Sequence, residues 1–93
     1  MVTHELKTRP KNFQPIYEGT KNFEIRYNDR DYKVGDRLRL REYDISTGKY
    51  SGMEVLVRVD YLLDSFEDPA ISLDYVVMST SIIYRTQGPE ESS

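Results

Sequence analysis

The chain of 93 residues is long enough for one compact domain and, with no cysteine and a single histidine, it excludes disulfides and conventional zinc sites. The net charge of −3 excludes a strongly basic nucleic-acid-binding domain, although residues 1–41 carry ten Lys and Arg against six Asp and Glu, and residues 42–93 carry three against ten. No apolar run reaches the ~20 residues that cross a bilayer and no signal-peptide pattern opens the chain, so we expect a cytoplasmic protein that binds no membrane and no metal.

The N-terminal segment predicts a short strand. It covers residues 1–8, with Leu6 turned inward and Lys7 turned outward. A loop or the entry to a helix follows at residues 9–12.

Two helix starts compete after this strand. Pro10 as the first helical residue would place Pro15 inside the helix, where its ring clashes and one hydrogen bond is lost. Asn12 as the N-cap would place Pro15 in the first turn, where backbone N–H groups are unpaired anyway. We therefore predict a helix over residues 13–18, ended by Gly19 in the left-handed conformation. The apolar spacing of three and four predicts a buried side made of Phe13, Ile16 and Tyr17.

The next strand, residues 21–28, alternates in polarity. A period of two places its apolar residues on one face and its charged residues on the other. We expect the apolar face to enter the core and the charged face to display an acid next to a base. The apolar residues are Phe23, Ile25 and Tyr27, and the charged residues are Glu24 and Arg26.

The remaining segments alternate between turn-rich loops and strands, and Asp36 is expected to fix the turn after Gly35. The predicted strands are 37–43, with Leu38 and Leu40 inward; 53–63, with Met53, Val55, Val57, Val59 and Tyr61 on one face; and 74–84. The predicted loops are 29–33, 44–52 and 64–73. We expect one domain over residues 1–85 and a disordered tail over residues 86–93, which offer no apolar anchor.

Five short strands, one short helix and many turns predict a mostly β fold. The expected architecture is a small, mostly antiparallel barrel, since closing the sheet hides edges that would otherwise aggregate.

A run of residues in the first half resembles a known signature. The order G-x-K-x-x-E-I-R over residues 19–26, followed by V-G-D at 34–36, is similar to the ASCH family of small PUA-like β-barrels. HELKT at 4–8 and NDRDYKVGD at 28–36 resemble a bacterial and phage branch of that family. The resemblance extends over residues 4–79 and implies an antiparallel or mixed barrel, a cleft between the helix and the barrel, and RNA binding.

Lys21, Glu24 and Arg26 are the central candidates for a site. In the ASCH family the matching lysine faces the cleft, and a lysine there can hold a phosphate as a point charge. Glu24 can accept hydrogen bonds from a base edge, and Arg26 can grip a phosphate or stack on a base. The structural alternatives are a solvated Lys21 and a Glu24 and Arg26 that pair with each other or with neighbouring strands.

Further positive charge lies near the helix start and in the loop after the second strand. Lys7 and Arg9, with His4 and Lys11, can line a phosphate track if the first strand borders the cleft, although Lys11 reads equally as a surface lysine. Arg30 lies in a solvated mixed-charge loop, and the resemblance makes it a rim residue.

Other charged and aromatic groups are expected to have structural roles. The arginines at 37, 39 and 41 form a basic ladder that we expect Glu54 or Asp60 to neutralise in part across the sheet. The tyrosines at 27, 32 and 43 can stack bases, but in small barrels they more often serve packing.

Three functions remain open. The preferred one is an RNA-binding or nucleotide-binding module, a monomer without a cofactor, that uses Lys7, Arg9, Lys21, Glu24, Arg26 and Arg30. The second is a small amidohydrolase acting on an acylated cytidine, as in similar ASCH-type proteins that use a Lys, a Thr and a Glu. Lys21 matches that pattern, but Glu24 occupies the position of the threonine nucleophile and Glu67 is only a loose match for the third role. We therefore favour a binding module over an enzyme and keep the amidohydrolase as an alternative. The third is a protein-interaction regulator that uses the acidic half.

Overall fold

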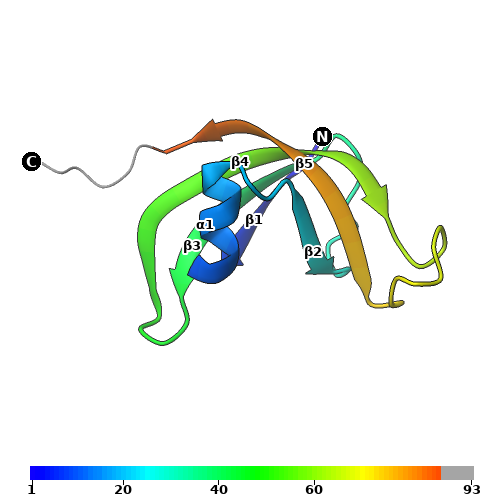
Figure 1. Cartoon of the computed structure of the whole chain (residues 1–93), viewed down its shortest axis with the longest axis horizontal. Coiled ribbons are helices and arrows are strands. Elements are labelled where there is room, and N and C mark those ends of the chain that lie inside the picture. Colours follow the sequence, from blue (N-terminus) through cyan, green and yellow to red (C-terminus); the bar gives the residue numbers. More distant parts are fainter. Residues whose placement is uncertain (87–93) are drawn as a thin grey trace, which may run out of the picture.

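The computed structural model describes residues 1–86, and its five strands form one mixed sheet that curls into a half-barrel (Figure 1). In chain order the elements are β1 (Thr3–Thr8), α1 (Pro10–Glu18), β2 (Phe23–Tyr27), β3 (Arg37–Asp44), β4 (Lys49–Leu63) and β5 (Tyr75–Arg85). The strand order is β1-β3-β4-β5-β2. β1 runs parallel to β3, and every other neighbouring pair is antiparallel. The predicted mostly β fold with five strands and one short helix is confirmed.

The hydrophobic core lies between α1 and the concave side of the sheet. α1 packs against β3 and β4 and inserts Phe13 and Ile16, which are fully buried. The inward positions predicted for Leu6, Leu38 and Leu40 are confirmed. The other members of the core are Tyr32, Val55, Val57, Val59, Val76 and Met78.

The predicted start of the helix is wrong. α1 begins at Pro10 with Arg9 as its N-cap, and the Arg9 carbonyl accepts from the backbone N–H groups of Asn12 and Phe13 at 2.9 and 2.8 Å. Pro15 therefore lies inside the helix, at the cost of one hydrogen bond to an exposed turn. Pro10 takes the first helical position, where its fixed φ favours a helix and its missing N–H costs nothing. Gly19 ends the helix at φ +90°, as predicted.

The predicted orientation of β2 is also wrong, because its charged face is the inner one. Glu24 lies opposite Met78 and Arg26 lies opposite Val76, and both β5 partners are fully buried. Residues directly opposite in neighbouring strands project to the same face of a sheet. The acid and the base therefore line the concave side beside the core. The apolar residues of β2 lie on the convex side with exposed fractions of 41% for Phe23, 55% for Ile25 and 55% for Tyr27.

The start of β4 and the orientation of Tyr61 also differ from expectation. The loop predicted over residues 44–52 is a tight turn, and β4 already begins at Lys49. An irregularity in the pairing of β4 and β5 between Val59 and Tyr61 breaks the alternation, so Tyr61 lies on the surface and not on the core face.

The turn after Gly35 is fixed by a buried, hydrogen-bonded pair of side chains. Asp36 Oδ2 lies 2.8 Å from His4 Nε2 and accepts from the Lys33 backbone N–H at 3.1 Å, and Oδ1 accepts from the Val2 N–H at 3.3 Å. This confirms the structural role of Asp36. It also removes His4 from the predicted phosphate track, because His4 is buried against Asp36 and Tyr32. Burial raises the pKa of Asp36, but the hydrogen bonds from His4, Val2 and Lys33 outweigh it, so the pKa lies below its ordinary value.

This lowered pKa predicts how stability depends on pH. The folded state favours the ionised Asp36, so its contribution is present above the ordinary pKa of 3.8 and is lost as the pH falls through the lower, folded value. We expect Asp36→Asn to lower the free energy of unfolding by about 1–3 kcal/mol at pH 7, where a charged acceptor is lost. Between pH 4 and pH 2 the free energy of unfolding of Asp36→Asn should fall less steeply than that of the wild type. Some decline should remain, because hydrogen bonds from Ser46 lower the pKa of Asp44 as well.

Urea titrations across this pH range make the measurement. Asp60→Asn is the matched control, because Asp60 pairs with Arg58 at 3.0 Å on the surface and should contribute little. Equal losses of stability in the two variants, or an unchanged pH profile in Asp36→Asn, would contradict the role given to the buried pair.

The C-terminal prediction lies almost wholly outside the described residues. Of the tail predicted over residues 86–93, only Thr86 is described, and its backbone N–H donates to the Glu54 carbonyl at 3.0 Å. In residues 1–86, no helix has the length and apolar content needed to span a membrane.

Candidate functional site

The candidate site is the seam where the two edge strands of the sheet, β1 and β2, face each other. Arginine side chains bridge this seam. Arg26 donates from Nη1 to the Lys7 carbonyl at 3.2 Å and from Nη2 to Thr8 Oγ1 at 2.8 Å. Arg30 donates from Nη1 to the Glu5 carbonyl at 3.2 Å. The half-barrel is thus held at its open side by long polar side chains, which leave space between the strands.

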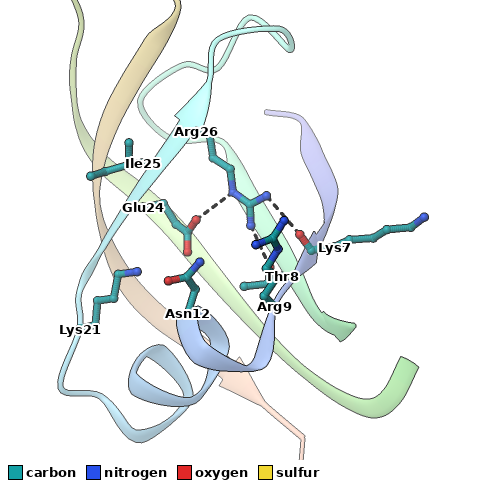
Figure 2. Close-up of a pocket in the computed structure, with 8 residues that line it drawn as sticks. All are labelled: Lys7, Thr8, Arg9, Asn12, Lys21, Glu24, Ile25 and Arg26. Atoms are coloured by element: carbon teal, nitrogen blue, oxygen red, sulfur yellow. Dashed lines mark hydrogen bonds and ion pairs between the residues drawn. The ribbon is translucent and has the colours of Figure 1, made fainter. Parts of the chain in front are cut away.

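A cavity of about 330 Å³ occupies one end of the seam, next to the start of α1 (Figure 2). This volume is at the lower end of the range for small-molecule pockets. The cavity is lined by Lys7, Thr8, Arg9, Asn12, Lys21, Glu24, Ile25 and Arg26.

Glu24 is the buried acid of this cavity, with 4% of its surface exposed. Its Oε1 accepts from Arg26 Nε at 2.9 Å, which confirms the structural alternative that the two residues pair. Its Oε2 is buried and accepts no hydrogen bond within the described part of the chain. A buried acceptor without a donor is costly, since it has given up water without a replacement. Glu24 Oε2 therefore offers a strong, prepositioned acceptor to a ligand N–H or O–H group.

Positive and amide groups surround this acceptor. Figure 2 shows the Lys21 ammonium and the Asn12 amide directed toward the space beside the Glu24 carboxylate. Lys21 Nζ also lies 5.2 Å from the centroid of the Phe23 ring, and Lys7 Nζ lies 4.7 Å from that of Tyr43. Figure 2 shows the Lys7 ammonium directed away from this space, so Lys21 and Arg9 are the cations that give the mouth of the cavity a positive potential despite the acidic chain.

A second cavity of about 420 Å³ continues along the seam. Its lining consists of Glu5, Leu6, Lys7, Arg26, Arg30 and Tyr50. The wall between β2 and β1 is supported by Tyr32, which packs its ring 4.8 Å from that of His4. Burial raises the pKa of the Tyr32 hydroxyl, and Arg26 and Arg30 offset only part of that rise, so Tyr32 stays neutral.

Two further residues bear on the amidohydrolase alternative. The hydroxyl of Thr8 lies in the cavity, but it accepts from Arg26 and donates to the Leu6 carbonyl at 3.4 Å. Glu67 lies in the loop after β4 and does not line the cavity. Among residues 1–86, no three His, Asp or Glu side chains are grouped as metal ligands.

The structure brings together five of the six residues selected from the sequence. Lys7, Arg9, Lys21, Glu24 and Arg26 line the first cavity, and Arg30 lines the second. Lys11 lines neither. Sequence reasoning missed Thr8, Asn12 and Tyr50, which had been assigned to the first strand, a helix cap and a hairpin loop. For Thr8 and Asn12, the available signal was their position beside the basic Arg9, where β1 leads into α1.

The basic ladder of β3 is neutralised in part, as expected, by Glu54 and not by Asp60, which pairs with Arg58. Arg39 Nε lies 2.8 Å from Glu54 Oε1, and Arg41 Nε lies 3.2 Å from Glu54 Oε2. Arg41 also donates from Nη1 to Glu5 Oε2 at 2.8 Å. The tyrosines serve packing: Tyr27 contacts Tyr75 on the convex side, with 5.6 Å between the ring centroids, and Tyr43 contacts Tyr50 at 4.9 Å.

Comparisons with known proteins give a family and one relative. The family model described as "Domain of unknown function (DUF3850)" matches residues 3–80. The "Uncharacterized 12.9 kDa protein in GpA 3'region" of Escherichia phage P2 is 38% identical over 61 residues, which are 66% of this chain and 54% of the phage protein. The match thus covers about half the length of that relative.

Proposed function

We propose that the chain, which belongs to the family described as "Domain of unknown function (DUF3850)", binds RNA or a nucleotide in the cavity around Glu24. In this proposal Glu24 Oε2 accepts a hydrogen bond from the base, and Arg9 and Lys21 hold the phosphate. The protein acts in the cytoplasm as a monomer and needs no cofactor. The unpartnered, buried Glu24 Oε2 amid cations is the observation that carries the proposal.

The combination of groups favours a nucleotide over other ligands. A nucleobase presents N–H donors on its edge, and the phosphate attached to it carries negative charge. The cavity offers one buried anionic acceptor, Glu24, for the base and two cations, Arg9 and Lys21, for the phosphate. A simple anion would be repelled by Glu24, and a simple cation would be repelled by the two basic side chains.

The sequence resemblance supports the same function. The order G-x-K-x-x-E-I-R resembles the ASCH signature, in which the matching lysine faces the cleft, and this resemblance implies the same for Lys21. The acidic total charge of the chain fits a selective pocket better than an extended, non-specific surface.

A pair of lysine variants tests the proposal. We expect Lys21→Ala to weaken the binding of short single-stranded RNAs by about fivefold to tenfold and to reduce the log–log salt slope by about 0.7, the value for one lost phosphate contact. Fluorescence anisotropy at several salt concentrations provides both quantities.

Lys11→Ala is the matched control, because it removes the same charge from the exposed surface of α1 outside both cavities. Its affinity should stay within twofold of the wild type. Equal effects of the two variants would mean that only the overall charge matters, and the localised site would be refuted.

A further inference from the structure

The two cavities of the seam are adjacent and share two lining residues. Lys7 and Arg26 line both, and the hydrogen bond from Arg26 Nη1 to the Lys7 carbonyl crosses the seam between them. Arg26 uses Nε, Nη1 and Nη2 for one bond each and keeps one further N–H on each Nη atom. A ligand that passes from the first cavity to the second therefore meets the Arg26 guanidinium at the boundary and the Lys7 ammonium beyond it, where Nζ lies 4.7 Å from the centroid of the Tyr43 ring.

The second cavity differs from the first in what it offers. Its cations are Lys7, Arg26 and Arg30, while the charge of its single acid, Glu5, is countered by Arg41 at 2.8 Å. It also contains an aromatic ring, Tyr50, which is 38% exposed. The Arg41 guanidinium lies 3.8 Å from the centroid of this ring and Tyr43 packs against it, so the ring is held in place. A fixed, partly exposed aromatic ring beside cations is a platform for stacking a base.

We propose that the seam binds two consecutive nucleotides of a single strand, in a fixed order of subsites. One base occupies the first cavity at Glu24, the next base stacks on Tyr50 in the second cavity, and Lys7 and Arg26 contact the phosphate between them. This inference rests on the proposed function, and it adds that the ligand is an oligonucleotide and not a free mononucleotide.

A length series of ligands tests this directly. The probes are a 5′-monophosphate, the 5′-phosphorylated dinucleotide and the 5′-phosphorylated trinucleotide of the same ribonucleotide, titrated at constant salt. We expect the dinucleotide to bind at least about fivefold more tightly than the mononucleotide, the lower limit for stacking one base on an aromatic side chain. The step from two to three nucleotides should be smaller than twofold. Equal affinity of the mononucleotide and the dinucleotide would overturn the two-subsite inference while leaving the proposed function intact.

A tyrosine variant tests whether the higher affinity for the dinucleotide arises in the second cavity. Tyr50→Ala should reduce the affinity for the dinucleotide to within about twofold of that for the mononucleotide, and Tyr50→Phe should restore it because the ring remains. Tyr84→Ala removes a tyrosine of β5 that is even more exposed, at 57%, and lies away from both cavities, so it should have no effect.

The remaining outcomes are equally decisive. If Tyr50→Ala still binds the dinucleotide at least about fivefold more tightly than the mononucleotide, the assignment of the second base to Tyr50 is overturned. If Tyr50→Ala does not fold, the length series alone decides. Binding of none of the three ligands overturns the proposed function, and the two-subsite inference with it. A deoxyribonucleotide series of equal affinity would show that the seam reads a single strand without contacting the 2′-hydroxyl.

Discussion

Replacing Arg26 by alanine is expected to lower the free energy of unfolding by about 2–3 kcal/mol. The change leaves the Glu24 carboxylate buried without a partner and removes the two hydrogen bonds that connect β2 to β1. Removing one member of a fully buried ion pair costs about 3–5 kcal/mol, and we expect less here because 22% of the Arg26 side chain is exposed. Urea denaturation followed by circular dichroism gives the value.

Two comparisons separate this effect from a general loss of charge. Arg39→Ala breaks an ion pair with Glu54 on the outer surface and should cost less than about 1 kcal/mol. Adding Glu24→Gln to Arg26→Ala should recover about 1 kcal/mol, because a neutral amide is cheaper to bury than an unpaired carboxylate. If Arg26→Ala were no more costly than Arg39→Ala, the arginine bridge would not hold the seam.

Glu24→Gln alone is expected to weaken nucleotide binding by about tenfold to hundredfold with little loss of stability. A hydrogen bond to a charged group contributes about 1.5–3 kcal/mol, and the amide replaces the charged acceptor by a neutral group. The glutamine oxygen can still accept from Arg26 Nε, so the free energy of unfolding should change by less than about 1 kcal/mol. Affinity and urea titrations on the same preparation measure the two effects.

Glu42→Gln provides the matched control for this variant. Glu42 is also buried, at 7% exposed, and accepts from Gln14 Nε2 at 2.7 Å, but it does not line the first cavity. Its binding affinity should stay within twofold of the wild type. Equal weakening by the two variants would show that the buried charge, and not the position of Glu24, is responsible.

Most of the fold could be predicted because alternation and turn residues are local signals. Leu38 and Leu40 were placed correctly by the period of two, and Gly19 by its freedom to adopt a positive φ. The helix start was missed because two local signals compete: Pro10 favours a start at its own position, and Pro15 opposes a helix that would enclose it. The sequence pattern alone does not show which of the two prevails.

The alternation of polarity in β2 identified the candidate site, but it also led to the wrong orientation of that strand. The alternation in β2 shows that Glu24 and Arg26 share a face, but it does not show which face is the inner one. Hydrophobicity favoured Phe23, Ile25 and Tyr27 as the inner set, and the pairing with β5 placed them outside. An inward acid and base at the open side of a curled sheet break the usual pattern, and functional sites are where such breaks are expected.

An NMR titration of uniformly ¹⁵N-labelled protein with short single-stranded RNA tests the binding proposal most directly. We predict chemical-shift changes that cluster at residues 7–12 and 21–26, the two segments that meet at the first cavity. Further changes at Arg30 and Tyr50 would follow ligand entry into the second cavity. Changes confined to the convex surface of β4 and β5, or no changes with either RNA or mononucleotides, would contradict nucleotide binding in the seam.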